Sequence, residues 1–346
     1  CYGCFKEERD ALLQIKVWIN HPSGEALPSW EDGDCCRWDF VVCNTTTKRV
    51  IQLFLGSIRD WKLGDLNLNT SLFWNLKELK SLDLSRNQLS PFPELNMNHY
   101  AGWCELKNLE QLYLSGNELV GVLPPCMRNL SSLLLMDLSS NQFKGNIATS
   151  PLVDLMSLQY LTFSSNQFRV PTSFASFSNH SKLKLISCDH NELITEPNLQ
   201  ISSASVFQLK FLSMSNCTSE TGKPDYPYFL YFQHDLRVLD LSNNNFGGQF
   251  PYWLVKNNTR LKQLYLKNNG LVRGPLQLNY PVSNLSTIDM SSNYMDDEML
   301  KTMCSVFPNL VGLMIADNHL TDAIPRCFEN MSYLAYLDMS NNKLSS

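Results

Sequence analysis

The apolar and polar positions of the chain follow one motif along most of its length, Leu-x-x-Leu-x-Leu-x-x-Asn-x-Leu. A clear copy runs from Leu79 to Leu89, and another runs from Leu109 to Leu119. Further copies begin at Leu133, Leu158, Leu183, Leu209, Leu236, Leu261, Leu285, Leu310 and Leu334, and a weaker one begins at Val50. Consecutive copies start 24 to 30 residues apart, so the chain has a nearly constant period.

This motif predicts a strand and the way successive strands stack. Its x-Leu-x-Leu-x part alternates polar and apolar residues, which indicates a short strand with one buried face. Because successive strands are one repeat apart, we expect them to stack in parallel, with the leucines inside and the x residues on a concave outer face. The period and the motif resemble those of leucine-rich repeats. The predicted fold class is therefore an α/β leucine-rich-repeat solenoid, a right-handed superhelix with a parallel concave β-sheet.

A recurring asparagine marks the turn that follows each strand. The backbone amides of that turn need partners, and an asparagine side chain can both donate and accept. We therefore expect these asparagines to form a scaffold ladder and not to contact a ligand. The ladder comprises Asn87, Asn117, Asn141, Asn166, Asn191, Asn244, Asn269, Asn293, Asn318 and Asn342, and Cys217 takes the same place in the copy that begins at Leu209.

Prolines recur at a second fixed distance. Pro124, Pro251 and Pro325 each lie seven residues after a ladder asparagine. Proline fixes the backbone of a turn, so we expect these turns on the convex side. In this respect the sequence resembles the plant-specific class of leucine-rich repeats.

Residues 1–49 lack the repeat and are predicted to form an N-terminal cap, and residues 50–346 are predicted to form an array of about twelve repeats. Ala11, Leu12, Ile15 and Ile19 follow helical spacing after an acidic first turn, which predicts a helix from Glu7 to Ile19. A cap shields the apolar side of the first repeat. No such segment follows the last copy, so we expect the array to lack a C-terminal cap.

Two pairs of the 11 cysteines can be matched by their position in the repeat. Cys104 and Cys126 lie at equivalent convex positions of consecutive copies, and so do Cys304 and Cys327. Adjacent coils are about 5 Å apart, a distance that suits a disulfide, and disulfides indicate an oxidising compartment. Cys188 replaces a buried leucine and is interpreted as a small core residue.

Charge and motif content exclude several classes of function. The net charge is −5 and no run of Lys or Arg could follow a phosphate backbone, so we expect no nucleic-acid partner. No stretch approaches the ~18 apolar residues that a membrane span requires, so any anchor must lie outside the chain. The six histidines are scattered, and no metal, phosphate or cofactor motif is present.

The recurring aspartates of the repeat could in principle form a catalytic acid pair, but their spacing favours a structural role. Aspartates recur on the outer side of the strands at Asp83, Asp137, Asp240, Asp289 and Asp338, but never in adjacent repeats. Those two strands apart would be about 9.6 Å apart along the stack, whereas a retaining glycosidase pair needs about 5 Å and an inverting pair needs about 6.5–9.5 Å with matched orientation. We interpret them as part of the common Leu-Asp-Leu-Ser repeat and expect no enzyme.

The outer face of the strands is the predicted ligand surface. Aromatic and arginine side chains dominate the binding energy of interfaces. The candidate ligand-binding residues are Tyr113, Tyr160, Phe211, Arg237, Lys262 and Tyr265. The alternative, that they are solvated strand residues without a ligand, stays open at this point. The aromatic run from Tyr226 to Phe232 also has two interpretations, an exposed recognition loop or packing on the convex side.

Glycosylation sequons are frequent. Predicted sites are Asn44, Asn69, Asn129, Asn179, Asn257, Asn284 and Asn330. Asn129, Asn179, Asn257 and Asn330 each lie four residues before the first leucine of a repeat, which places them on the predicted convex surface. Asn216 also lies in a sequon but abuts the ladder, so we leave it out.

Several stretches together resemble plant receptor-like proteins, which are membrane-anchored repeat ectodomains without a kinase. The cap motif Cys-x-x-Cys-x-x-Glu-Glu-Arg-x-Ala-Leu-Leu runs from Cys1 to Leu13, and Cys35-Cys36-Arg-Trp38 follows it. The mid-chain stretches 227–233 and 251–254 also resemble sequences that are typical of the family. The resemblance implies disulfides Cys4–Cys35 and Cys36–Cys43 and leaves the pairing of Cys1 open.

The same resemblance implies a function. It predicts an extracellular ligand-recognition domain of a plant cell-surface receptor in immune or developmental signalling. The ligand would be a peptide, a protein or a carbohydrate from the wall. Signalling would pass through an adaptor receptor kinase and a co-receptor kinase, at the extracellular face of the plasma membrane. The alternative is a secreted leucine-rich-repeat inhibitor of microbial enzymes that degrade cell walls.

Overall fold

The computed structural model describes residues 4–31, 33–90, 104–195, 207–220, 222–272 and 284–345. The chain divides into two compact units, Cys1–Arg169 and Val170–Ser346, which we call unit 1 and unit 2. This division does not coincide with the predicted boundary between a cap and an array at residue 50, which stays a prediction.

Unit 1 begins with the predicted cap helix. Helix α1 spans Lys6–Ile19 and buries Ala11, Leu12, Ile15 and Ile19, as their spacing predicts. The acidic first turn does more than favour the helix start, because the carboxylate of Glu8 is itself buried. Its Oε2 accepts a hydrogen bond of 3.2 Å from the Val50 backbone N–H, and the Glu8 and Arg49 side chains form an ion pair at 3.5 Å. Glu8 thus joins the cap to the first repeat strand.

A parallel sheet runs through unit 1 in chain order. Its strands are β1 (Val41–Cys43), β2 (Val50–Phe54), β4 (Ser81–Asp83), β6 (Gln111–Tyr113), β8 (Leu135–Asp137) and β10 (Tyr160–Thr162). Strand β1 pairs antiparallel with β2, and each later strand pairs in parallel with the one before it. The middle residues Leu53, Leu82, Leu112, Met136 and Leu161 are all fully buried. The leucine positions of the motif therefore form the core.

The other side of unit 1 carries short strands and single-turn helices. The strands are β3 (Leu66–Asn67), β5 (Leu89–Ser90), β7 (Val120–Gly121), β9 (Gln142–Asn146) and β11 (Gln167–Pro171). The 3-10 helices are η1 (Cys35–Arg37), η2 (Trp61–Leu63), η3 (Thr70–Phe73), η5 (Pro125–Asn129), η6 (Ile147–Thr149) and η7 (Pro151–Asp154). Strand β9 pairs in parallel with both β7 and β11, so this side has a second sheet.

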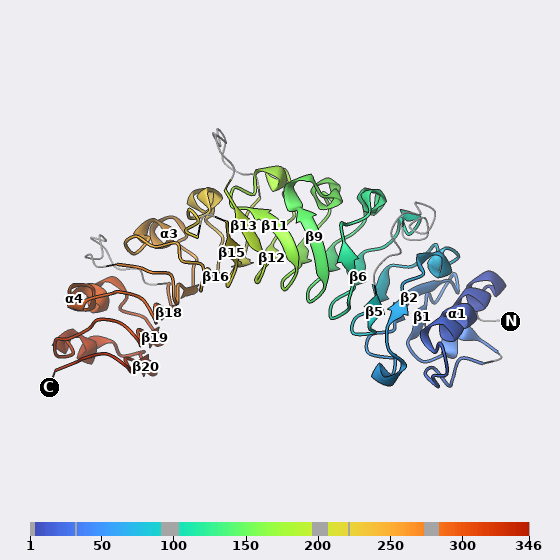
Figure 1. Cartoon of the computed structure of the whole chain (residues 1–346), viewed down its shortest axis with the longest axis horizontal. Coiled ribbons are helices and arrows are strands. Elements are labelled where there is room, and N and C mark those ends of the chain that lie inside the picture. The colour runs from blue at the N-terminus through green and yellow to red at the C-terminus, as the bar shows by residue number, and fades with distance from the viewer. Residues whose placement is uncertain are drawn as a thin grey trace. The chain divides into compact units, whose positions relative to one another are not determined.

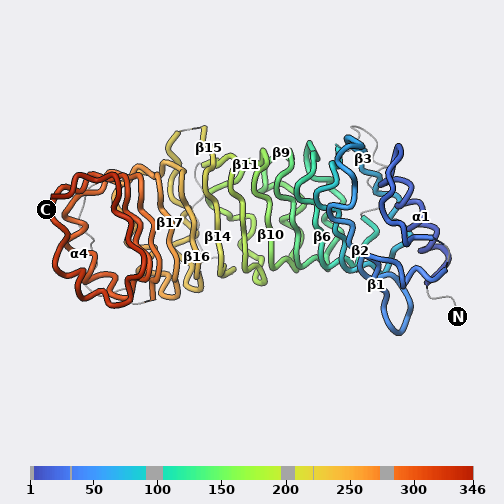
Figure 2. The backbone as a smooth tube through the Cα atoms, turned by 90° about the horizontal axis from the view of Figure 1, so that it is seen from below, coloured from blue at the N-terminus to red at the C-terminus, as the bar shows by residue number. Residues whose placement is uncertain are grey.

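Unit 2 repeats the same arrangement. Its sheet consists of β12 (Leu185–Ser187), β14 (Phe211–Ser213), β16 (Val238–Asp240), β17 (Gln263–Tyr265), β18 (Thr287–Asp289), β19 (Gly312–Met314) and β20 (Tyr336–Asp338). These strands are parallel and follow chain order, as the tube trace shows for β14, β16 and β17 (Figure 2). The other side carries β13 (Glu192–Ile194), β15 (Thr218–Ser219), η8 (Ala175–Phe177), η9 (Tyr228–Phe232), α3 (Tyr252–Asn257), α4 (Asp297–Val306) and η10 (Arg326–Asn330). Figure 1 shows α3 and α4 on the side of unit 2 away from the strands.

The asparagine ladder is confirmed by its hydrogen bonds. Asn117 is typical: its Nδ2 donates to Leu84 O at 3.0 Å and to Leu114 O at 2.9 Å. Its Oδ1 accepts from the backbone N–H groups of Asn87 and Leu89, at 2.9 and 3.0 Å. Asn141, Asn244 and Asn293 likewise bond their own turn and the turn of the preceding repeat, and almost all of the ladder side chains are buried. This accounts for asparagine at this position without any ligand.

The predicted disulfides and prolines also take their expected places. Cys4–Cys35, Cys36–Cys43, Cys104–Cys126 and Cys304–Cys327 are bonded, with Cα–Cα distances of 5.8, 5.4, 5.5 and 5.8 Å. Pro124, Pro251 and Pro325 each directly precede a short helix, η5, α3 or η10. Cys188 is a buried free thiol, as expected, and Cys1 lies outside the described residues. The leucine-rich-repeat solenoid predicted from the sequence is confirmed.

Candidate ligand-recognition surface

The outward side chains of each strand form straight rows across neighbouring repeats. We number every repeat from its first leucine, so that the ladder asparagine is position 9. Positions 3 and 5 then lie at the two ends of each three-residue strand, and position 2 directly precedes it. The parallel register pairs position 3 with position 3 and position 5 with position 5 throughout each unit. We call this outward surface the strand face.

Position 5 carries the same three-residue pattern in both units. In unit 1 Tyr113 lies between Asp83 and Asp137, and in unit 2 Tyr265 lies between Asp240 and Asp289. Partial burial raises the pKa of Tyr113 and of Tyr265, and the two flanking carboxylates raise each further. Both predicted tyrosines are therefore half-buried neutral phenols on the strand face.

The recurring aspartates are used by the scaffold. Asp83 Oδ1 accepts a hydrogen bond of 2.9 Å from the Ser85 backbone N–H, and Asp240 Oδ1 accepts one of 2.9 Å from Ser242. Asp137, Asp289 and Asp338 make the same contact two residues along. Such a bond closes a local turn at the end of the strand. The tyrosine between each pair also keeps the carboxylates two strands apart, as the sequence predicted.

The other predicted ligand residues also lie on the strand face, each within its own unit. Tyr160 starts β10 in unit 1 and is 40% exposed. Phe211 starts β14 in unit 2 and is half-buried, between Leu185 and Val238 in the register. Arg237 and Lys262 are exposed at position 2 of unit 2. With Arg260 and Asn284 they line a shallow pocket of 280 Å³.

Sequence reasoning missed one charged group on this face. Asp189 occupies position 7, where most repeats have serine, and Ser187 occupies position 5. Its Oδ1 accepts from Ser213 Oγ at 2.5 Å and from the Ser215 backbone N–H at 2.6 Å. Burial by itself would raise the pKa of Asp189, but these hydrogen bonds outweigh it and lower the pKa. The sequence does carry a signal for this site, because Ser187 and Asp189 reverse the usual order of aspartate at position 5 and serine at position 7.

The aromatic run from Tyr226 to Phe232 packs on the convex side, as one of its two predicted interpretations has it, and its role in recognition stays a prediction. Phe229 and Leu230 of η9 are buried, whereas Tyr228 and Tyr231 are 50% and 40% exposed. Tyr231 stacks on Trp253 of α3 with ring centroids 3.8 Å apart. The run therefore packs on the helix side of unit 2, away from the strand face, and leaves part of its aromatic surface exposed.

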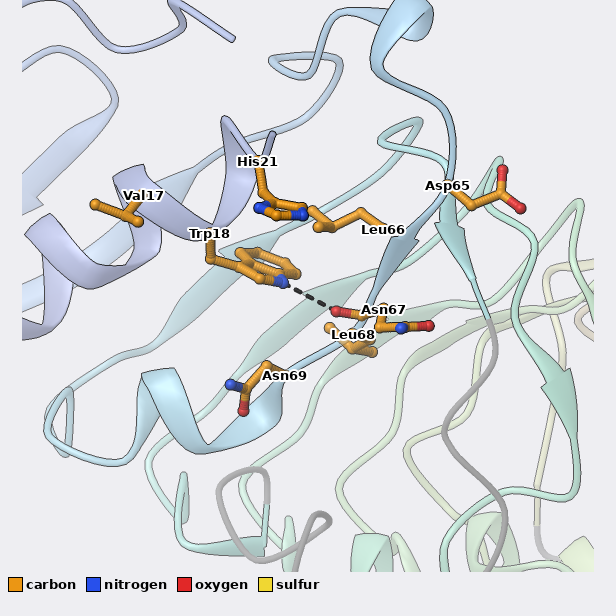
Figure 3. Close-up of a pocket in the computed structure, with 8 residues that line it drawn as sticks. All are labelled: Val17, Trp18, His21, Asp65, Leu66, Asn67, Leu68 and Asn69. Atoms are coloured by element: carbon orange, nitrogen blue, oxygen red, sulfur yellow. Dashed lines mark hydrogen bonds between the residues drawn. The ribbon is translucent and has the colours of Figure 1, made fainter. Parts of the chain in front are cut away.

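A second pocket lies at the cap, away from the strand face of unit 1. It has a volume of 540 Å³ and is lined by the end of α1 and the segment 65–69. Figure 3 shows Trp18 pointing across it, and its Nε1 donates to Asn67 O at 2.9 Å. The predicted glycosylation site Asn69 lies at its rim, where its Oδ1 accepts from the Ser71 backbone N–H at 3.2 Å.

The remaining predicted glycosylation sites occupy the ends of short helices or turns. Asn129 and Asn330 are exposed at the last residue of η5 and of η10, and Asn179 is exposed shortly after η8. Asn257 is only half-buried at the end of α3, and its Nδ2 donates to Tyr231 O at 3.1 Å. Asn44 is half-buried and accepts from two backbone N–H groups, and Asn284 is exposed. Their glycosylation stays a prediction.

Two absences hold within the described part of the chain. Among those residues, no group of three or more His, Cys, Asp or Glu side chains is placed to hold a metal ion. In the same residues, no helix combines the length and the apolar character that crossing a bilayer requires.

Comparison with known families supports the repeat and the cap. Residues 5–44 match the leucine rich repeat N-terminal domain, and residues 78–98, 108–130 and 235–257 match the Leucine Rich Repeat. Cuscuta receptor 1 of Solanum lycopersicum is 40% identical over 70% of this chain and 21% of its own length. Receptor-like protein 1 of Arabidopsis thaliana is 37% identical over 72% of this chain and 22% of its own length.

The chain contains leucine-rich repeats and their N-terminal domain, and the relatives that it matches are plant receptor-like proteins. Receptor like protein 21 of Arabidopsis thaliana matches 100% of this chain at 28% identity, over 48% of its own length. This chain thus spans about half or less of the curated relatives it matches. Among solved structures, the ectodomain of the Arabidopsis receptor kinase HAESA, bound to an IDA peptide hormone, has a TM-score of 0.77 and 25% identity, over 99% of this chain and 54% of its own.

Proposed function

We propose that this chain is part of the extracellular ligand-recognition domain of a plant cell-surface receptor. The observation that carries the proposal is that scaffold and outward positions are separate. The leucines, the ladder asparagines and the position-5 aspartates satisfy the fold, whereas outward positions such as Tyr160, Phe211 and Arg237 vary from repeat to repeat. Aromatic and arginine side chains presented in this way suit recognition.

The comparisons favour a receptor over the secreted inhibitor. The relatives are receptor-like proteins, and the HAESA ectodomain holds a peptide hormone on the same fold. For this chain we propose a peptide or protein ligand and signalling through an adaptor receptor kinase and a co-receptor kinase at the plasma membrane. We propose no catalytic role, because the recurring carboxylates are engaged in turns.

The test replaces Tyr160, Phe211 and Tyr265 with alanine in the full-length protein expressed in plant cells. We expect the receptor to reach the cell surface at normal abundance and to lose its response to extracellular extracts that activate the natural protein. The matched control replaces Tyr228, Tyr231 and Tyr252, exposed aromatics on the helix side, and should keep the response. A normal response from the strand-face variant would refute a recognition site on this face.

A further inference from the structure

One edge of the strand face in unit 2 carries an unbroken row of positive charge. Lys184, Lys210, Arg237 and Lys262 all occupy position 2 of consecutive repeats, and we call them the basic row. Backbone hydrogen bonds join each to the next: Lys210 N donates to Lys184 O at 2.7 Å, Arg237 N to Lys210 O at 2.9 Å, and Lys262 N to Arg237 O at 2.9 Å. At ~4.8 Å per strand, the row is about 14 Å long.

Three of the four members of the row are not neutralised by neighbouring acids. Lys210, Arg237 and Lys262 are exposed and make no ion pair within the described part of the chain. Nearby, Arg260 pairs with Asp235 at 2.6 Å, which uses the acidic group closest in sequence to the row. Like charges side by side on a sheet destabilise it. The chain as a whole has a net charge of −5, so the row is a local exception.

Unit 1 shows what position 2 looks like without such a row. Its equivalent residues are Ile51, Lys80, Glu110, Leu134 and Gln159. The two charged ones have opposite signs and form an ion pair, with Lys80 Nζ 2.8 Å from Glu110 Oε1. The repeat itself therefore does not require cations at position 2, and the basic row of unit 2 needs another explanation.

An apolar strip runs beside the basic row. Leu185, Phe211 and Val238 occupy position 3 of the first three of these repeats and are in register with one another. All three side chains are only half-buried. A ligand lying along the row would thus meet cations on one side and apolar groups on the other.

We propose that the basic row and the apolar strip bind an extended peptide that carries both acidic and apolar side chains. In an extended peptide successive side chains point to opposite sides, so one side can face the cations and the other can face the strip. Three alternate carboxylates span about 13 Å, close to the length of the row. The apolar strip favours a peptide over an anionic polysaccharide, which has no apolar side chains. This inference rests on the proposed function and specifies its ligand class.

The test uses a synthetic peptide of about eight residues, long enough to cover the row when extended at ~3.3 Å per residue. Glutamate and leucine alternate in it, and a second peptide has glutamine in place of glutamate. Binding to the purified chain, expressed in plant cells, is measured by calorimetry at two salt concentrations. We expect the glutamate peptide to bind, the glutamine peptide to bind at least about tenfold more weakly, and added salt to weaken binding.

Two charge-reversal variants locate the site. K210E/R237E should lower the affinity by about tenfold or more, whereas K144E/K256E, the same charge change at exposed lysines outside the row, should leave it nearly unchanged. Equal loss in both variants, no loss in K210E/R237E, or equal binding of the glutamine peptide would overturn the proposal. Binding of polygalacturonate in place of the peptide would overturn the choice of a peptide. None of these results touches the alanine test of the strand face, so the two proposals can fail separately.

Discussion

Units 1 and 2 are built from one repeat, yet they differ wherever the repeat leaves a choice. Both have buried apolar residues on the inner side of the strands, a ladder made mostly of asparagine, and the same Asp-Tyr-Asp pattern at position 5. At position 2, unit 1 pairs Lys80 with Glu110, and unit 2 lines up four cations. The residues that recur with the period therefore form the scaffold. The residues that differ between the units at equivalent positions are the better candidates for function.

The units also differ in what stabilises them. Unit 1 has the cap, where the buried guanidinium of Arg59 donates to Ile19 O at 2.7 Å, His21 O at 2.8 Å and Gly64 O at 2.9 Å. These bonds join the end of α1 to the first repeat. Unit 2 has two substitutions within its repeats, Asp189 at position 7 and Cys217 in the ladder. Each of these differences can be removed by mutation.

The largest expected effect follows from removing the cap contact of unit 1. Arg59→Ala leaves several buried carbonyls without their charged donor, which should cost about 3 kcal/mol of unfolding free energy. Urea unfolding with hydrogen exchange should show the loss in α1 and the first repeats, with unit 2 unchanged. Arg86→Ala, at an exposed arginine of the same unit, is the control and should change stability by less than about 0.5 kcal/mol. A uniform loss across both units would contradict this account.

The second effect concerns unit 2 and depends on pH. Asp189→Asn removes the charge that accepts bonds from Ser213 and Ser215 and should cost about 2 kcal/mol at pH 7. Because the pKa of Asp189 is lowered in the folded state, its carboxylate stabilises above its ordinary pKa of 3.8, and the contribution is lost as pH falls through the folded value. The difference between the natural chain and the variant should therefore shrink in acid. A difference independent of pH would mean that the charge does not contribute.

The smallest expected effect comes from restoring the amide that the ladder lacks at Cys217. Cys217 Sγ makes only sulfur contacts, 3.6 Å to Cys188 O and 3.5 Å to Ser215 O, where an asparagine would donate and accept through its amide. Cys217→Asn should raise the unfolding free energy by about 1 kcal/mol. Cys217→Ser, which is small and lacks the amide, is the matched control and should give no gain. Equal stability of the two variants would show that the ladder position of unit 2 does not need an amide.

Most of the scaffold could be predicted from the sequence, because it repeats. The leucine spacing predicted the strands, the equivalent positions of Cys104 and Cys126 predicted their disulfide, and Ala11 to Ile19 predicted α1. A contact that occurs only once in the chain cannot be predicted from the repeat. Arg59 and Glu8 lie in ordinary polar contexts, and only the folded cap shows that their charges are buried.

The candidate site could be predicted only in part. Alternation placed Tyr113, Tyr160, Phe211 and Tyr265 outward, and Arg237 and Lys262 were named from their residue type. Arg237 and Lys262 share position 2 of the repeat with Lys184 and Lys210, which the sequence already indicates. Backbone hydrogen bonds between residues 25 to 27 positions apart show that the four are neighbours. The half-burial of Asn257 against Tyr231 was hidden, since it depends on the stack of η9 on α3.

Lysine footprinting tests the central claim most directly, namely that the strand face of unit 2 is the recognition surface. The chain is acetylated with and without the alternating glutamate-leucine peptide, and each lysine is quantified by mass spectrometry. Lys210 and Lys262 should be protected by the peptide, whereas the exposed Lys256 on α3 should react equally in both samples. Protection of Lys256 with unchanged reactivity of Lys210 and Lys262 would contradict the account.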